Sequence, residues 1–219
     1  MPRLLFEKTG NAIFISHLDL MRLFQRAFKR ANLKLTHTQG FNPRPSVSIP
    51  LPLSVGVESV CEMLDFQLDG ETIACEEIKD RLNSALVDGI RVREAYENGR
   101  KNRELAFLEC QVLLEYESGV PAGAEDTIRE LFSRQSLTVS KKSKNGPQEQ
   151  DIIPMIRRLE PMRKSETVLE IQAMVCCQEP SLNPAQLALA IETYLPHLKP
   201  DFFKCRRLEV FDRQETIFR

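Results

Sequence analysis

The sequence predicts an α+β protein of two ferredoxin-like (split β-α-β) lobes, with mostly antiparallel sheets that carry helices on one face. Hydrophobic patterns typical of strands and helices follow the order strand, helix, strand, strand, helix, strand twice along the 219 residues. Between the two series lies a polar segment, 96–104, which contains Gly99. We therefore expect a first lobe at 1–98 and a second at 99–219.

The first lobe opens with two short strands over 3–16 that turn at Thr9-Gly10-Asn11. Ser16 then caps a helix, with Asp19 three residues later in the capping-box position. Apolar residues at helical spacing give this helix one buried face. The other elements expected in this lobe are strands over 46–59, 61–68 and 89–97 and a helix over 72–86.

The second lobe repeats this order. Its predicted helices begin at Ala122 and at Asn183, which acts as a cap before Pro184. The predicted strands lie at 104–116, 136–156, 166–177 and 203–212. The segment 136–156 contains a basic hairpin closed by Asn145-Gly146.

Composition places the chain among ordinary globular proteins, since 42% of its residues are hydrophobic and 28% are charged. No apolar run is long enough to span a bilayer and the first ten residues hold no signal-peptide core, so we expect a cytoplasmic protein with no membrane contact. None of the six cysteines forms a C-x-x-C pair. This spacing favours buried, reduced thiols and predicts neither a metal site nor a cofactor.

The net charge of −1 conceals a strong segregation of charge. Residues 1–50 hold eight basic and two acidic side chains, a net charge of +6, whereas residues 51–90 hold two basic and nine acidic side chains, a net charge of −7. Such a separation indicates an electropositive surface, for which anionic ligands are the natural candidates.

Basic residues form a ridge on the first helix. Arg22, Arg26 and Arg30 follow one another at i, i+4 and i+8, with Lys29 beside them. Like charges in such a row repel each other, so an anionic partner would stabilise the ridge. Three interpretations remain open: a solvated helix face, a surface for RNA or another polyanion, and a contact with acidic residues of this chain or of a partner.

The segment 36–46 predicts a constrained loop, because Gly40 is followed by Asn42, Pro43 and Pro45 within five positions. Such a loop could present Phe41 as a stacking surface for a base, with Arg44 beside it as a fork for a phosphate. The alternative is a turn whose phenylalanine covers the core.

Lys141, Lys142 and Lys144 form the basic part of the predicted hairpin in the second lobe. Lysines at such a position commonly keep a strand edge soluble. They would equally supply a second contact with phosphates.

Two motifs, Ser16-His17-Leu18-Asp19 and Gly40-Phe41-Asn42-Pro43, carry a family resemblance together with seven further positions: Arg26, Pro45, Gly56, Glu58, Ser59, Glu62 and Asp65. This pattern resembles the radical-SAM-linked proteins of unknown function (DUF2344), which occur alone or fused to a radical SAM protein. Relatives favour histidine where this chain has Arg44. Arginine cannot act as a base there, but it can contact an anion.

The resemblance implies that a radical SAM protein, as a separate chain, is the partner. Radical SAM chemistry itself needs three neighbouring thiolates to hold its cluster, and the chain has no such triplet. The resemblance therefore implies an accessory protein that is not an enzyme on its own.

Paired ferredoxin-like lobes also resemble the CRISPR-associated endoribonucleases that process repeat RNA. That resemblance implies general acid–base cleavage of RNA, for which His17 and His37 would be the candidates. The other interpretation is that Ser16, His17 and Asp19 fix the start of the helix and its bonds to the adjoining loop.

Three carboxylates of the family pattern, Glu58, Glu62 and Asp65, raise the question of a divalent cation. Strand periodicity places Glu58 and Glu62 on one face and Asp65 on the other, which disfavours a shared ion. We expect them instead to pair with Arg26 or Arg44.

We conclude from the sequence that this is an accessory module of a radical SAM enzyme, which binds structured RNA such as tRNA or rRNA through the basic helix and the constrained loop. Two alternatives remain: a metal-independent RNA-processing enzyme, and a protein–protein adaptor for the radical SAM partner.

Overall fold

The computed structural model describes residues 1–70, 72–143 and 146–219. Contacts divide the chain into two units, Met1–Glu104 together with Arg219, and Leu105–Phe218. Residues 99–104, which the sequence assigned to the second lobe, belong to unit 1 by their contacts. The reason is that Arg3 binds the carbonyl of Arg100 at 2.9 Å and the Oδ1 atom of Asn102 at 2.7 Å.

Unit 1 is a four-stranded antiparallel sheet in the order β4-β1-β3-β2, with two helices. Its elements in chain order are β1 (Arg3–Lys8), a 3₁₀ helix η1 (Gly10–Phe14), α1 (His17–Arg30), β2 (Val47–Ser48), β3 (Glu58–Phe66), α2 (Cys75–Asn83), β4 (Ile90–Tyr96) and η2 (Asn102–Glu104).

Unit 2 repeats this topology with the sheet order β10-β5-β9-β8, again antiparallel, and inserts a two-stranded ribbon, β6-β7. Its elements are β5 (Leu105–Glu115), α3 (Ala124–Phe132), β6 (Thr138–Ser143), β7 (Gly146–Asp151), η3 (Ile153–Met155), β8 (Ile156–Arg163), β9 (Val168–Cys176), α4 (Ala185–Tyr194), η4 (Pro196–Leu198) and β10 (Phe202–Asp212). Both units thus have the split β-α-β order, and the predicted α+β class is confirmed.

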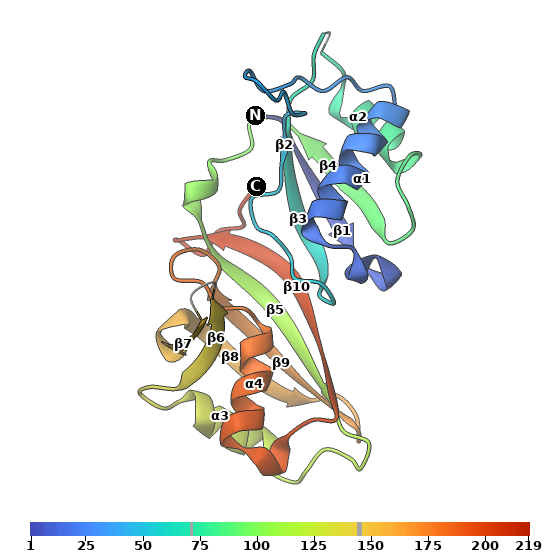
Figure 1. The fold of residues 1–219 in the computed structure, drawn as a ribbon. Helices are drawn as coiled ribbons and strands as arrows, with labels where there is room; N and C mark the ends of the chain where they lie inside the picture. The colour runs from blue at the N-terminus through green and yellow to red at the C-terminus, as the bar shows by residue number, and fades with distance from the viewer. Residues whose placement is uncertain (71, 144–145) are drawn as a thin grey trace. The chain divides into compact units, whose positions relative to one another are not determined.

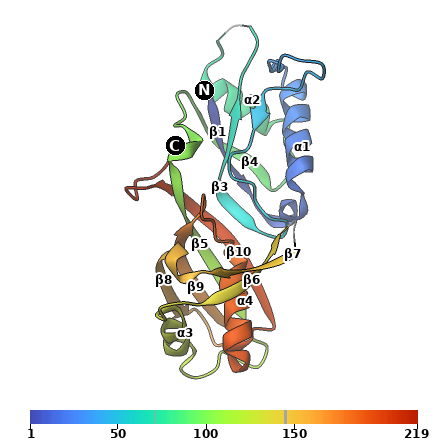
Figure 2. The same ribbon diagram turned by 60° about the vertical axis from the view of Figure 1, so that its left-hand side comes forward.

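The core of unit 1 lies between one face of its sheet and both helices, which Figures 1 and 2 show on the same side. Phe24 of α1 packs on Phe6 with ring centroids 4.8 Å apart, and Phe28 packs on Phe66 at 5.3 Å. The helical spacing of these residues produces this packing, because it turns the apolar side chains of α1 toward the sheet. In unit 2, α3 and α4 cover one face of the second sheet (Figure 2).

Two expected elements differ from the structure, and one strand was not expected. The second strand of the 3–16 hairpin is absent, because the chain closes into η1 after Thr9, whose N–H donates to the carbonyl of Gly89 at 2.8 Å. Most of the expected strand at 46–59 is irregular, since Pro50 and Pro52 have no N–H to give to a sheet. The unexpected strand is β8, in which four of the eight residues are charged, so that its sequence has no apolar alternation from which a strand could be predicted.

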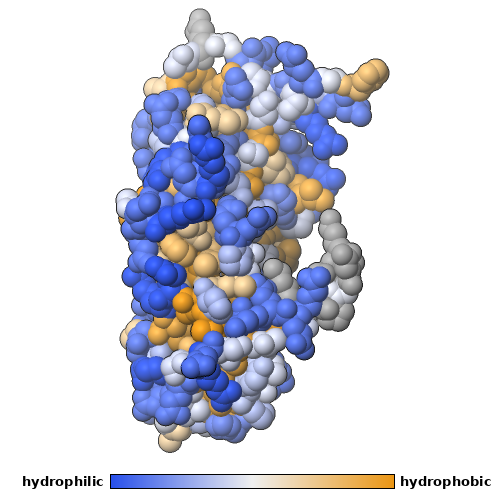
Figure 3. Space-filling model, turned by 90° about the vertical axis from the view of Figure 1, so that its left-hand side faces the viewer, coloured by the Kyte–Doolittle hydropathy of each residue, from blue (hydrophilic) through white to orange (hydrophobic). Residues whose placement is uncertain are grey.

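Hydrophilic side chains cover most of the face drawn in Figure 3, with hydrophobic side chains gathered in smaller patches among them. In the part of the chain that the structure describes, no helix has the length and apolar character needed to cross a bilayer.

Candidate nucleic-acid interface

The Ser16–Asp19 motif fixes the first turn of α1, which confirms the predicted cap. The Oγ atom of Ser16 accepts from the N–H of Asp19 at 3.2 Å, and the hydroxyl donates to Oδ2 of Asp19 at 2.7 Å. The Ser16 hydroxyl and then Arg22 lower the pKa of Asp19, because both donate hydrogen bonds to its carboxylate. The motif therefore serves the helix start.

The two candidate histidines lie at different places in unit 1. His17 is the first residue of α1, and its Nδ1 atom is buried with no hydrogen-bond partner in the described part of the chain. His37 is exposed and pairs through its backbone with Pro45. Among the described residues no hydrogen bond joins these two histidines.

The basic ridge (Arg22, Arg26, Lys29 and Arg30) is exposed along α1. Arg22 is held by Asp19, with Nη1 to Oδ1 at 3.0 Å, and Arg30 donates to the carbonyl of Ala85. Within the described ranges, the side chains of Arg26 and Lys29 make neither an ion pair nor a hydrogen bond. Within this part of the chain, two cations of the ridge, Arg22 and Arg30, have intramolecular partners, whereas the other two, Arg26 and Lys29, do not.

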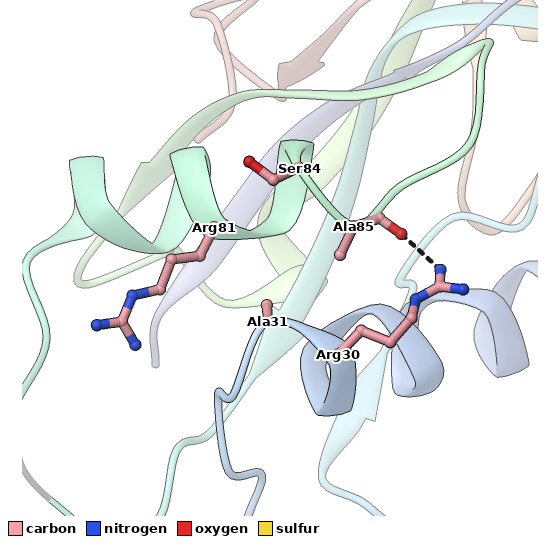
Figure 4. Close-up of a pocket in the computed structure, with 5 residues that line it drawn as sticks. All are labelled: Arg30, Ala31, Arg81, Ser84 and Ala85. Atoms are coloured by element: carbon pink, nitrogen blue, oxygen red, sulfur yellow. Dashed lines mark hydrogen bonds between the residues drawn. The ribbon is translucent and has the colours of Figure 1, made fainter.

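A hollow of about 520 Å³ adjoins the end of this ridge and is lined by Arg30, Ala31, Arg81, Ser84 and Ala85. Figure 4 shows the Arg30 and Arg81 side chains extending in opposite directions, with Arg30 bonded to the Ala85 carbonyl. The hollow lies beside the carboxyl ends of α1 and α2, where backbone carbonyls carry partial negative charge. The hollow therefore does not form an anion site in which Arg30 and Arg81 could both contact the same anion.

The segment 36–46, here named the aromatic loop, folds back on itself. The N–H of Thr38 donates to the carbonyl of Arg44 at 2.8 Å, and the N–H of Ser46 donates to the carbonyl of Thr36 at 2.8 Å. The N–H of Arg44 in turn donates to Oγ1 of Thr38 at 3.0 Å. At the base, the N–H of Thr36 binds the carbonyl of Gln67, just beyond β3, at 2.9 Å. These bonds hold the loop as a narrow projection.

Phe41 lies at the tip of the aromatic loop with an exposed fraction of 107%. The ring therefore contacts no core residue, which excludes the alternative that it covers the core. Gly40 next to it has a φ angle of +140°, a backbone conformation that residues other than glycine rarely adopt. Arg44 is exposed too, and within the described residues its side chain has neither an ion pair nor a hydrogen bond.

The prediction that Asp65 pairs with Arg26 or Arg44 is wrong. Its Oδ1 atom accepts from Nε of Arg3 at 2.6 Å, and both side chains are almost completely buried. Leu64 and Phe66 face the core beneath the helices, so Asp65 between them points to the opposite face of the sheet.

The other two carboxylates do not reach the basic ridge either. Glu62 is 1% exposed. Burial lowers the pKa of the Lys8 ammonium, and the negative charge of Glu62 only partly opposes that shift. Nζ of Lys8 donates to the carbonyl of Ile13 at 2.8 Å, while Glu58 accepts from the N–H of Gly10 at 3.4 Å. Among the described residues no group of His, Cys, Asp or Glu could hold a metal ion. The sequence analysis missed the burial of Lys8, since a lysine in a strand normally reaches solvent.

Three large apolar side chains are exposed although their residue types suggest burial: Phe14, Leu18 and Val55, here named the apolar patch. Phe14 and Leu18 are each 67% exposed, and Val55 is 56% exposed. The N–H of Gly56 binds the carbonyl of Ile13 at 2.9 Å, which holds the segment after Val55 against η1. No sequence signal separates these residues from core residues, because hydrophobicity alone does not report exposure.

The Lys-rich ribbon belongs to unit 2. Lys141 and Lys142 lie in β6 opposite Gln148 and Pro147, whereas Lys144 lies outside the residues that the structure describes. The hydroxyl of Tyr194 in α4 donates to the carbonyl of Thr138 at 2.7 Å and ties the ribbon to this unit.

The cysteines are free thiols. Burial raises the pKa values of Cys110, Cys177 and Cys205 to about 12, which keeps these thiols protonated and unreactive near neutral pH.

The fold is similar to that of a chain in the crystal structure of a Cbf5-Nop10-Gar1 complex, with a TM-score of 0.55 and 10% identity. The match covers 95% of this chain and 48% of that chain, so this chain spans about half the length of its structural relative. An unknown protein from Galdieria sulphuraria matches with a TM-score of 0.27 and 10% identity, over 94% of this chain and 96% of that one. At 10% identity, the likeness to the chain of the Cbf5-Nop10-Gar1 complex concerns the fold alone.

No curated protein sequence matches the chain. The family model described as "Uncharacterized protein conserved in bacteria (DUF2344)" matches residues 2–184, which include α1, the aromatic loop and the Lys-rich ribbon. This chain therefore belongs to that bacterial family.

Proposed function

We propose that this chain is the accessory RNA-binding module of a radical SAM enzyme. The observation that carries the proposal is the aromatic loop, which holds the ring of Phe41 fully in solvent. Three positions later the exposed side chain of Arg44 has no ion pair or hydrogen bond with any residue that the structure describes. A large apolar ring gains by leaving water, so a phenylalanine at a braced loop tip suits a surface that stacks on a ligand. A nucleotide has a flat base and a charged phosphate, which match the ring and the guanidinium respectively.

Cations on α1 extend the proposed contact. Arg26 and Lys29, which have no ion pair or hydrogen bond among the described residues, could contact phosphates directly, whereas Arg22 and Arg30 would first have to leave Asp19 and the Ala85 carbonyl. Each phosphate neutralised by such a residue releases a counterion and strengthens binding at low salt.

The Lys-rich ribbon supplies a second basic element in the proposal. Lys141, Lys142 and Lys144 would contact phosphates of the same structured RNA, such as a tRNA or rRNA fragment. The proposal assigns no chemical step to this chain, because modification of the RNA would belong to the radical SAM partner.

The apolar patch favours a second candidate function, a docking surface for the radical SAM protein. Three apolar side chains that are more than half exposed lose contact with water when a partner covers them. This surface differs from the aromatic loop, so the chain could hold the enzyme with one and the RNA with the other. An adaptor without RNA binding would use the apolar patch alone.

Fluorescence anisotropy with a labelled tRNA stem-loop tests the main proposal. We expect an Arg26→Gln, Lys29→Gln, Arg44→Gln variant to bind about tenfold more weakly than wild type at low salt, because three phosphate contacts are lost. The control changes the same charge elsewhere on unit 1 and is expected to bind within about twofold of wild type; it carries Arg91→Gln, Arg93→Gln and Arg103→Gln. Equal losses in the two variants would contradict a localised RNA surface.

Co-purification with a radical SAM protein of the source organism tests the second candidate. A Phe14→Ser, Leu18→Asp variant should lose the enzyme and keep its affinity for the stem-loop. If this variant keeps the enzyme, the apolar patch is not the docking surface.

A further inference from the structure

We infer that the aromatic loop binds an unpaired nucleotide, whose base stacks on Phe41 and whose phosphate is held by Arg44. This inference rests on the proposed RNA binding and adds the class of RNA: a bulge, a loop or another single-stranded element, rather than a continuous duplex.

The exposure of the Phe41 ring favours a base that has left the helical stack. Phe41 has an exposed fraction of 107%, so none of the described residues covers the faces of its ring. In a duplex each base is covered on both sides by its neighbours, so a ring outside the helix has no base face to stack on. A base that has left the stack offers that face, and sequence-tolerant stacking on aromatic side chains is how proteins bind such bases.

The single positive charge of the aromatic loop matches a single phosphate. Arg44 is the only lysine or arginine between residues 35 and 78. Pro43 and Pro45 flank it and have no backbone N–H, so they cannot donate to a phosphate. One ring and one guanidinium three positions apart supply the contacts of a single nucleotide, whereas a duplex groove would be bound by several cations along its backbone.

Hydrogen bonds within the aromatic loop hold it in one conformation before a ligand binds. The bonds from Thr38 to Arg44 and from Ser46 to Thr36 hold both sides of the projection before any ligand arrives. A pre-formed loop loses little conformational freedom on binding, which favours capture of a flexible, unpaired nucleotide. Insertion of the ring between paired bases would instead require unstacking them, at an energetic cost that an unpaired base avoids.

Two RNA hairpins of the same stem test the inference, one fully paired and one with a single-nucleotide bulge of 2-aminopurine. Wild type is expected to bind the bulged hairpin at least about fivefold more tightly and to quench the 2-aminopurine fluorescence, because the base stacks on the ring. Phe41→Ala should remove the preference and the quenching, while Phe41→Tyr keeps both. Val87→Ala, a control at another exposed apolar residue of unit 1, should behave as wild type.

The outcomes separate the two proposals. If wild type binds both hairpins equally well and Phe41→Ala changes neither affinity, the inference is overturned and RNA binding stands. Tighter binding of the paired hairpin would also overturn it. If wild type binds neither hairpin at low salt, the proposed function itself fails. Because the ring contacts no core residue, Phe41→Ala should keep the thermal midpoint of wild type, so loss of folding does not confuse the result.

Discussion

Replacement of Asp65 by alanine is expected to destabilise unit 1 by about 3–5 kcal/mol, because it leaves a buried guanidinium without its carboxylate. The side chains of Arg3 and Asp65 are 2% and 7% exposed, and two hydrogen bonds of 2.6 and 3.2 Å join them. Asn102 and the carbonyl of Arg100 would still accept from Arg3, but neither can neutralise its charge. Since domains are stable by only about 5–15 kcal/mol, this loss is large.

Urea unfolding followed by circular dichroism measures the loss, and hydrogen exchange on peptides from β1 and β3 localises it. Asp69→Ala is the control, because its pair with Lys34 is exposed and such pairs contribute at most about 1 kcal/mol. An Arg3→Met, Asp65→Leu double variant should recover much of the stability, since neither of these two positions then holds a buried charge. If Asp65→Ala costs no more than Asp69→Ala, the buried pair does not stabilise unit 1 as described.

Three further predictions concern other parts of the molecule. Ser16→Ala should lower the free energy of unfolding by about 1 kcal/mol at pH 7 in urea titrations. Because the pKa of Asp19 is lowered in the folded state, its carboxylate stabilises the cap above about pH 4 and this contribution disappears as the pH falls further. An unchanged difference at pH 2.5 would contradict a contribution of the bond from the Ser16 hydroxyl to the Asp19 carboxylate. Thr38→Val removes the acceptor that braces the aromatic loop and should weaken stem-loop binding about threefold with little change in urea unfolding; unchanged affinity would show that the brace is unimportant. A maleimide at pH 7.5 should label only the half-buried Cys75 and Cys176 in the native protein and all six thiols in urea, and faster labelling of a third thiol would contradict the burial.

The regular elements could be predicted because their residues are periodic. The stripe that contains Phe24 and Phe28 specifies α1 and its buried face, and Ser16 specifies where the helix begins. The structure of segment 46–59 was harder to predict, because its apolar residues are typical of a strand while its prolines prevent one from forming over most of its length. The 3₁₀ helix η1 depends on a bond between Thr9 and Gly89, and no local pattern reports a contact across so many residues.

The residue types of the candidate site could be predicted from the sequence, but the partners and the exposure of their side chains could not. Charge and composition drew attention to α1 and the aromatic loop. Only the fold shows that Arg22 and Arg30 have partners whereas Arg26 has none among the residues that the structure describes, because those partners depend on side-chain reach and on the end of α2. The same holds for Asp65, whose side chain lies on the sheet face opposite the core, and for Phe14, which is exposed although its residue type suggests burial.

The salt dependence of RNA affinity tests the central claim most directly. For wild type, the logarithm of the binding constant for the stem-loop should fall linearly with the logarithm of salt concentration, with a slope of about −0.7 to −0.9 per phosphate contacted. The variant without the positive charges of Arg26, Lys29 and Arg44 should have a slope smaller in magnitude by about 2–3. Equal slopes for the two proteins, or no binding by wild type at low salt, would contradict an RNA surface built from α1 and the aromatic loop.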